Sequence, residues 1–214
     1  MKKYIYLFLL CVLLVGCSNN KNIPNKINDN SVAINDSGVN TSNIDDYLFR
    51  EDVVYVDLRP YSWVAKDGHI AGFSFFPFYD LIAHRKNDDR LFKMDVVYKD
   101  DGNKILGGEI GSFTPNFMES EMVINRLFPK DKYIFTISQS GLEGCYFLNL
   151  LIQLGYEPSK LYNVGGFSIS TGFENLAYTS IENPKYLVKG NPILTDVQDI
   201  TFDFMKNLTP IENN

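Results

Sequence analysis

The chain has 214 residues, of which 45% are hydrophobic and 14% aromatic. This length and composition suit one globular domain with appendages and with enough apolar side chains to bury a core. The formal net charge is −6, and no stripe of Lys and Arg is present to neutralise phosphates, so DNA and RNA are excluded as expected partners.

The first 17 residues have the pattern of an export signal. Lys2 and Lys3 precede an apolar stretch over 4–15, which is shorter than the roughly 20 residues of a membrane-spanning helix. The stretch ends in Leu-Val-Gly-Cys, which resembles a bacterial lipobox. The resemblance implies a lipoprotein signal peptide over 1–17, in which Cys17 receives fatty acyl chains such as palmitate and holds the protein in a membrane. A plain transmembrane anchor and an ordinary signal peptide are the alternatives.

Lipidation implies a place in the bacterial cell envelope, either at the outer membrane or at the periplasmic face of the inner membrane. Ser18 after the lipid-bearing cysteine favours the outer membrane. Cys11 leaves with the signal peptide and Cys17 carries the lipid, so Cys145 is the last cysteine of the mature chain. An intramolecular disulfide is therefore excluded, and Cys145 is expected to be buried.

Residues 18–46 are rich in Asn, Ser and Asp, with single Val and Ile residues that follow no period. This composition predicts a disordered linker. As a flexible tether it would hold the domain on the order of 30 Å from the bilayer.

The folded domain is predicted to begin with a strand over 52–58. Its residues are apolar on both faces, which is typical of a buried parallel strand. Asp57 and Arg59 lie at the strand end, where we expect charge-assisted hydrogen bonds to tie the adjacent turn together. The pattern continues with Gly-His-Ile-Ala-Gly at 68–72, a short strand at 74–76 that runs into a proline, and a helix at 78–84.

These motifs resemble the opening half of a rhodanese-like domain, which has Asp-x-Arg, then Gly-His-Ile-x-Gly, then a strand that ends in Pro. A later short strand over 160–164 is followed by Gly-Gly-Phe, which matches the same family. The resemblance implies a three-layer α/β fold over 47–175, with a central, mostly parallel sheet flanked by helices. The residues that match the family's structural motifs are Asp57, Arg59, Gly68, His69, Gly72, Gly165 and Gly166.

The two histidines, His69 and His84, are too few for a metal cluster, and no metal or cofactor is expected. His69 is a candidate catalytic base. The resemblance instead implies that the histidine of this turn has a structural, hydrogen-bonded role. His84 is expected to be a solvated helix end.

Residues 85–111 are an insertion relative to the rhodanese-like pattern. Asp-Asp-Gly-Asn at 100–103, around Gly102, is a strong hairpin signal between two β-prone stretches at 95–99 and 104–106. The hairpin is a lid, an interaction surface or a tolerated surface insertion.

A helix is predicted to start at Thr114-Pro115, with Thr as N-cap and Pro at the first helical position. Its expected core face carries Phe117, Met118, Met122 and Leu127, which recur at helical spacing. Residues 176–214 have mixed apolar content and are expected to form a C-terminal extension that packs on the domain.

The central stretch over 133–155 reads as strand, polar turn and helix. The turn is Ser138-Gln139-Ser140-Gly141, and an apolar segment of helical length follows it. A loop of this kind aims successive backbone N–H groups at one point above a helix N-terminus, which suits an anion or an anionic nucleophile.

Active rhodaneses carry Cys-Arg-x-Gly-x-Arg in this loop. With Gly141 aligned to the motif glycine, Ser138 stands at the nucleophile, Gln139 at the first Arg and Glu143 at the last. Serine cannot take a sulfur atom as a persulfide, and no Ser–His–Asp pattern is visible to activate it. Glu143 turns an attraction for an anionic donor into a repulsion of roughly 4 kcal/mol. The degenerate loop, for which no catalytic residue is expected, comprises Ser138, Gln139, Ser140, Gly141, Leu142 and Glu143.

The sequence therefore predicts a catalytically degenerate, membrane-anchored binding or interaction module. Its loop would bind a polar or cationic group through Ser138, Gln139, Ser140 and Glu143, and its partner is an unidentified small molecule or envelope protein. The alternative is an active rhodanese-type sulfurtransferase with an atypical site, for instance with Cys145 as a displaced nucleophile. A vestigial loop and a purely structural envelope component also remain open.

Overall fold

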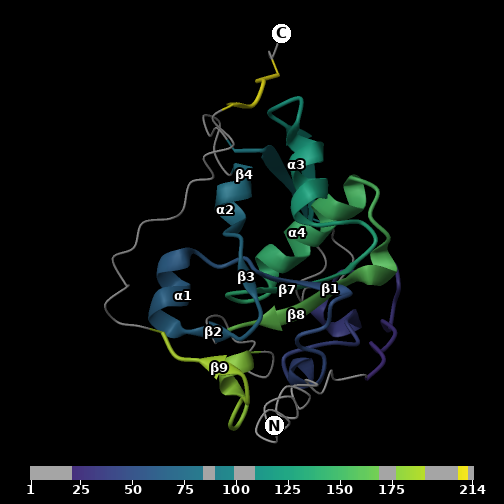
Figure 1. Ribbon diagram of the computed structural model, residues 1–214. Coiled ribbons are helices and arrows are strands. Elements are labelled where there is room, and N and C mark those ends of the chain that lie inside the picture. Colours follow the sequence, from purple (N-terminus) through teal and green to yellow (C-terminus); the bar gives the residue numbers. More distant parts are fainter. Residues whose placement is uncertain (1–20, 84–89, 99–108, 169–176, 191–206, 212–214) are drawn as a thin grey trace, which may run out of the picture.

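The computed structural model describes residues 21–83, 90–98, 109–168, 177–190 and 207–211. A four-stranded parallel sheet lies at its centre and helices flank it, an α/β arrangement compatible with a three-layer fold (Figure 1). The strand order is β3 (Ser74–Phe75), β1 (Val53–Asp57), β7 (Tyr133–Ser138) and β8 (Leu161–Gly166).

The predicted strands form because their residues are apolar on both faces, so each strand is covered from two sides. β8 is buried along its whole length, and β7 at every residue after Tyr133. Alternate residues enter two separate clusters: Ile134 contributes to one, and Phe135 and Ile137 to the other. The predictions of a buried strand at 52–58 and of a strand before the central loop are confirmed.

Helices cover one face of the sheet. α2 (Phe78–Leu81), α3 (Ser120–Leu127) and α4 (Leu142–Gln153) contribute buried residues to the cluster that contains Ile134. α1 (Tyr61–Asp67) follows β1 and lies toward the edge of the molecule, next to β3 and the short strand β2 (Figure 1). None of the described helices is both long and apolar enough to cross a bilayer.

The other face is covered by chain from both ends of the domain. The single turn η2 (Ile44–Asp46) buries Ile44, and η5 (Tyr178–Ser180) buries Tyr178, both in the cluster with Phe135. β9 (Leu187–Val188) pairs antiparallel with β2 (His69–Ile70). The described residues beyond 176 therefore pack on the domain, as expected for the C-terminal extension.

The predicted insertion forms a second sheet of three strands, in the order β4 (Ile82–Ala83), β5 (Phe92–Tyr98) and β6 (Glu109–Pro115). β5 and β6 are antiparallel, and β5 contains residues 95–98 of the first predicted strand. The turn around Gly102 and the stretch 104–106 lie outside the described residues. The Gln153 amide fastens β6 to α4, because it accepts from Phe113 N–H at 3.0 Å and donates to Phe113 O at 2.5 Å.

The predicted helix start at Thr114-Pro115 is wrong, because both residues end β6. Thr114 pairs with Lys93 and Pro115 with Phe92, and a proline without an N–H is tolerated at a strand end. Ser120 begins the helix instead. Its hydroxyl accepts from Phe117 N–H at 3.1 Å and donates to Leu91 O at 2.7 Å.

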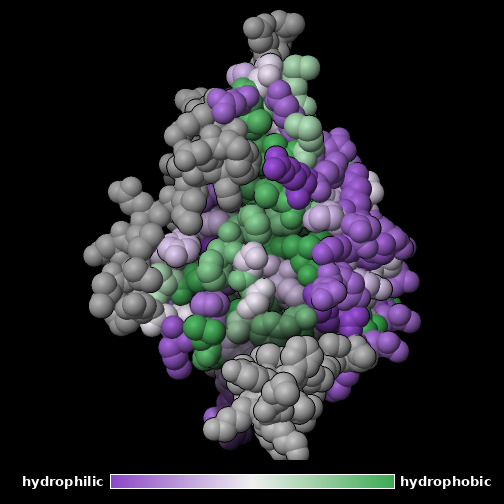
Figure 2. Space-filling view, viewed as in Figure 1, coloured by the Kyte–Doolittle hydropathy of each residue, from purple (hydrophilic) through white to green (hydrophobic). Residues whose placement is uncertain are grey.

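The expected core face of this helix is also wrong at its two methionines. Met118 is 75% exposed and Met122 is 63% exposed, while Val123 and Ile124 are buried. Figure 2 shows hydrophobic surface at the upper end of the molecule, around the start of α3. The later start of the helix turns the two methionines outward.

Residues 21–46 are not a tether, so the prediction of a disordered linker over 18–46 is wrong for this part. Several of its single apolar residues are buried in separate places, among them Val32, Ile34 and Val39, and η1 (Ile34–Asp36) adds a turn of helix. Lys26 Nζ donates to Pro158 O at 2.8 Å. Residues 18–20 lie outside the described chain.

The expected helix at 78–84 is shorter than predicted. α2 ends at Leu81, and Ile82 already belongs to β4, which pairs parallel with β5. Ile82 and Ala83, which follow α2, thus belong to the second sheet and not to a longer helix. His84 lies outside the described residues. η3 (Pro158–Lys160) connects α4 to β8.

Candidate functional site

The loop of residues 138–141 joins β7 to α4 at the carboxyl end of a central strand. Ser138 pairs in register with Gly166 of β8, and Phe167 N–H donates to Ser138 O at 2.8 Å. A Cβ at Gly166 would lie 2.9 Å from Gln139 O, which is closer than real Cβ atoms come to backbone. Glycine at 166 therefore allows the loop to lie flat on the end of β8.

Gly141 closes the loop and precedes α4. Its φ is +89°, in the left-handed region that favours glycine. A Cβ at this position would also collide with Ile34 Cδ1 of the N-terminal segment. Ile34, about a hundred positions earlier in the chain, therefore occupies the space next to the Gly141 Cα on the inner side of the loop.

The Ser138 side chain is fully buried and its hydroxyl is occupied. Gly141 N–H donates to Ser138 Oγ at 2.8 Å. One of the backbone N–H groups that were predicted to bind an anion is therefore bonded to the serine side chain. In the part of the chain that the structure describes, no histidine hydrogen-bonds to this hydroxyl. By accepting this amide hydrogen the serine oxygen closes the turn between β7 and α4, and it is not open to solvent.

Cys145 is fully buried in the first turns of α4, as predicted. Its Sγ lies 3.4 Å from Val32 O, to which the thiol donates, and it accepts from Asn163 Nδ2 at 3.2 Å. Ile34 and Leu142 pack around it. The thiol is enclosed between α4, β8 and the N-terminal segment, and it is not accessible to a substrate as a displaced nucleophile would have to be.

Asn163 organises the inner side of the loop, and sequence reasoning missed it. Its side-chain amide donates to Gly141 O at 2.9 Å and to Val32 O at 3.4 Å, and its Oδ1 accepts from Gly165 N–H at 3.2 Å. The residue is fully buried in β8. The available signal was its polarity, because a lone Asn inside an otherwise apolar strand needs hydrogen-bond partners.

The outer side of the loop carries acceptors. Gln139, Ser140 and Glu143 are partly exposed, and Gln139 Nε2 donates to Ser168 Oγ. Gln139 Oε1 and Glu143 Oε2 are shielded from solvent and meet no hydrogen-bond donor among the described residues. Glu143 lies in the first turn of α4, where the partial positive charge of the helix N-terminus stabilises a carboxylate.

Tyr79 of α2 lies within electrostatic reach of Glu143. Its pKa is raised, first by burial and then by the negative charge of Glu143. The side chain is nevertheless 46% exposed. A phenol ring and a carboxylate therefore lie near one another at the rim of the loop.

A buried ion pair supports the loop from the side of β1. Arg59 Nε and Nη2 donate to the Asp57 carboxylate, at 2.9 Å to Oδ1 and 2.6 Å to Oδ2, and both side chains are fully buried. Arg59 Nη2 also donates to Gly68 O at 2.8 Å, and its guanidinium lies 3.5 Å from the centre of the Phe167 ring. The predicted charge-assisted bonds between Asp57 and Arg59 are confirmed.

The Gly-His-Ile turn packs against β9, but the expected hydrogen bond of the His69 side chain is absent among the described residues. Gly68 has φ +91°, and a Cβ there would collide with Val188 O of β9. His69 pairs with Val188, and its ring stands edge-on to Phe75 with centroids 5.0 Å apart. Burial lowers the pKa of His69, which favours the neutral imidazole. At Gly72, with φ +87°, a Cβ would approach the Phe49 ring to 3.0 Å.

The structure thus brings the predicted loop residues together but divides their roles. Ser138 and Gly141 are buried and hydrogen-bond to each other inside the domain. Gln139, Ser140 and Glu143 are partly exposed and form the outer rim. Within the described residues, no group of three or more His, Cys, Asp or Glu side chains is placed to hold a metal ion. Comparisons with protein families, with curated proteins and with solved structures give no match.

Proposed function

We propose that this protein is a membrane-anchored, catalytically degenerate rhodanese-like domain that acts as a binding or interaction module in the bacterial cell envelope. The observation that carries the proposal is the hydrogen bond from Gly141 N–H to Ser138 Oγ, at 2.8 Å inside a fully buried loop. The fully buried hydroxyl is not open to a substrate, and no histidine among the described residues hydrogen-bonds to it to take its proton. Burial of Cys145 removes the second candidate nucleophile in the same region.

The chemistry of the outer rim favours a cationic or donor-rich ligand. Glu143 Oε2 and Gln139 Oε1 are acceptors without donors among the described residues, and the exposed aromatic side chain of Tyr79 lies within electrostatic reach of Glu143. A carboxylate beside an aromatic ring suits an ammonium or guanidinium group of a small molecule or of an envelope protein. Anionic sulfur donors such as thiosulfate would be repelled by the same carboxylate.

Anchoring follows from the lipobox-like Leu-Val-Gly-Cys sequence and belongs to the same proposal. Acyl chains on Cys17 would hold the domain at the outer membrane or at the periplasmic face of the inner membrane. Mass spectrometry of the protein extracted from bacterial membranes tests this part, because acylation adds a defined mass to the N-terminal peptide.

A sulfur-transfer assay tests the absence of rhodanese turnover. The purified protein is incubated with thiosulfate and cyanide, and thiocyanate is measured. We expect no thiocyanate above the level of the Cys145→Ser variant, because neither Ser138 nor Cys145 offers an accessible thiolate. Turnover that this substitution abolishes would establish the sulfurtransferase alternative instead.

A thermal-shift titration with spermidine tests the cationic ligand class. A polyamine that binds the folded state raises Tm with concentration. We expect this rise to be lost in Glu143→Gln, whereas the exposed Glu157→Gln serves as a matched control of net charge and keeps it. An equal rise in all three proteins would show charge screening only and would count against binding at the loop.

A further inference from the structure

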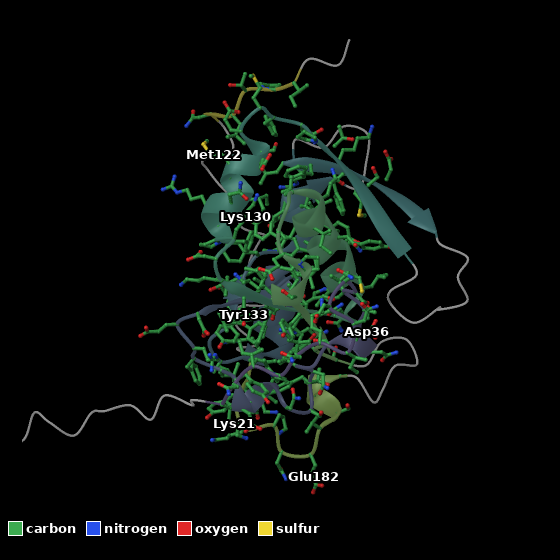
Figure 3. The ribbon with its side chains drawn as sticks, turned by 90° about the vertical axis from the view of Figure 1, so that its right-hand side faces the viewer. Lys21, Asp36, Met122, Lys130, Tyr133 and Glu182 are labelled. Carbon is green, nitrogen blue, oxygen red and sulfur yellow. The ribbon has the colours of Figure 1, made fainter. Side chains whose placement is uncertain are left out.

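One end of the molecule combines an exposed phenylalanine, a half-buried tyrosine, lysines and the start of the described chain. It contains Lys21, Phe49, Lys185 and Tyr186, which are called here the anchor-side surface. Arg50 Nη1 donates to Lys21 O at 2.6 Å, so the residue that follows Phe49 holds the start of the described chain. Figure 3 places Lys21 at the lower end of the molecule and Met122 at the opposite end.

Chain length brings this end close to the proposed anchor. Only residues 18–20 separate Cys17 from Lys21, and a fully extended chain of this length spans at most about 14 Å. Residues 21–46 cannot lengthen the connection, because they are packed on the domain. If Cys17 is acylated, the end that carries Lys21 is therefore held at the bilayer.

Phe49 is the main apolar feature of this end. Its side chain is 57% exposed, although a phenyl ring in water gains nothing for stability. Its φ is +62°, a left-handed conformation that costs a non-glycine residue of order 1 kcal/mol or more. The ring stands edge-on to Tyr186, with centroids 5.4 Å apart. The chain thus adopts a strained conformation that leaves Phe49 exposed beside the half-buried Tyr186.

Lysines border the aromatic pair. Lys185 Nζ lies 4.8 Å from the centre of the Tyr186 ring, and the Lys185 side chain is exposed. Of the carboxylates at this end, Asp46 pairs with Lys21 at 2.8 Å and Asp45 accepts from Tyr178 OH at 2.7 Å, whereas the exposed Glu182 has no ion pair among the described residues (Figure 3). Aromatic rings flanked by lysines are the side chains that settle at a membrane interface, where rings sit among headgroups and ammonium groups reach lipid phosphates.

We infer that the anchor-side surface rests on the lipid bilayer, with Phe49 and Tyr186 among the headgroups and Lys21 and Lys185 at lipid phosphates. This inference rests on the acyl anchor of the proposed function and adds an orientation to it. The outer rim of the loop and the exposed Met118 and Met122 of α3 are then presented by a domain that sits directly on the membrane.

Fluorescence quenching on the full lipidated protein tests the inference. The chain has one tryptophan, Trp63, on α1, and Trp63→Phe gives a background without tryptophan. Phe49→Trp in this background places a reporter on the anchor-side surface, and Met122→Trp is the matched control at the opposite end. Each protein is reconstituted into vesicles of phosphatidylethanolamine and phosphatidylglycerol, with and without brominated acyl chains. Tyr186→Trp is a second reporter in case the substitution of Phe49 disturbs folding.

We expect brominated lipid to quench most of the emission of the Phe49→Trp and Tyr186→Trp proteins and to leave the emission of the Met122→Trp protein unchanged. Flotation and the mass of the N-terminal peptide are measured on the same samples. An acylated protein that floats with the vesicles but shows no difference between the two ends overturns the orientation and leaves the anchor intact. A protein that carries no acyl group and does not float overturns the anchor, and the orientation with it.

Discussion

The guanidinium carbon of Arg59 lies 3.5 Å from the centre of the Phe167 ring, so the strand end after β8 is fastened to the turn after β1 by a stacked cation. The same guanidinium neutralises Asp57 in a fully buried pair. The ends of β1 and β8, which lie on either side of β7, are thereby held together next to the central loop.

Removing the cation should be costly. Arg59→Met leaves the Asp57 carboxylate buried without its partner, and we expect the free energy of unfolding to fall by about 3–5 kcal/mol. Urea titration measures the loss. The double variant with Asp57→Asn should lose less than the sum of the two single variants, because the unpaired charge is then absent. An Arg59→Met protein as stable as the exposed-pair variant Glu157→Gln would contradict this account.

Asn163→Ala should loosen the seal over Cys145. The substitution leaves Gly141 O, Val32 O and Gly165 N–H without their side-chain partner in the interior, and we expect a loss of about 2–4 kcal/mol. Cys145 should also react faster with a thiol reagent under native conditions. Asn149→Ala is the control. Asn149 lies on α4, the helix that carries Cys145, and its side-chain amide donates to Cys145 O. Equal labelling rates in the two variants would rule out a seal at Asn163.

Gly141→Ala should destabilise the protein for two separable reasons. The positive φ costs about 1–2 kcal/mol for any residue with a Cβ, and the collision with Ile34 Cδ1 adds an overpacking cost of about 1–3 kcal/mol. Ile34→Val removes that methyl group, so the double variant should recover only the steric part. A double-mutant cycle by urea unfolding measures the coupling. Strict additivity would mean that Ile34 does not fill the loop.

Alkaline pH should weaken the folded state through its buried tyrosines. Burial raises the pKa of Tyr55 to about 12 and that of Tyr162 to about 12, from the ordinary value of 10. Because the folded pKa is the higher one, the stabilisation is complete below pH 10 and is lost as pH rises through 12. Unfolding titrations between these pH values should show the decline. In Tyr162→Phe it should be shallower, and an unchanged decline would exclude Tyr162 as a contributor.

The central sheet and its ion pair could be predicted because their signals are local. An apolar run on both faces specifies a buried strand, and Asp57 and Arg59 are two residues apart at the end of one. Thr114-Pro115 carried a local signal too, but it suits a strand end as well as a helix start. Pairing with β5 decided between them, and that pairing is a tertiary contact.

The N-terminal segment could not be predicted from a periodic pattern. Val32, Ile34 and Val39 each fill a different site, so their spacing reflects the shape of the domain surface and not a helix or strand. Their polar neighbours gave the segment the composition of a linker. The same reason hid the role of Asn163, whose partners Val32 and Gly141 are distant in sequence.

The bond from Asn163 to Val32 joins residues 131 positions apart, and it sets the order in which the protein can be completed. The segment that leaves the ribosome first has its docking site in one of the last strands to be made. Closing so long a loop is entropically expensive and therefore slow. The early segment must therefore stay undocked until β8 has been synthesised.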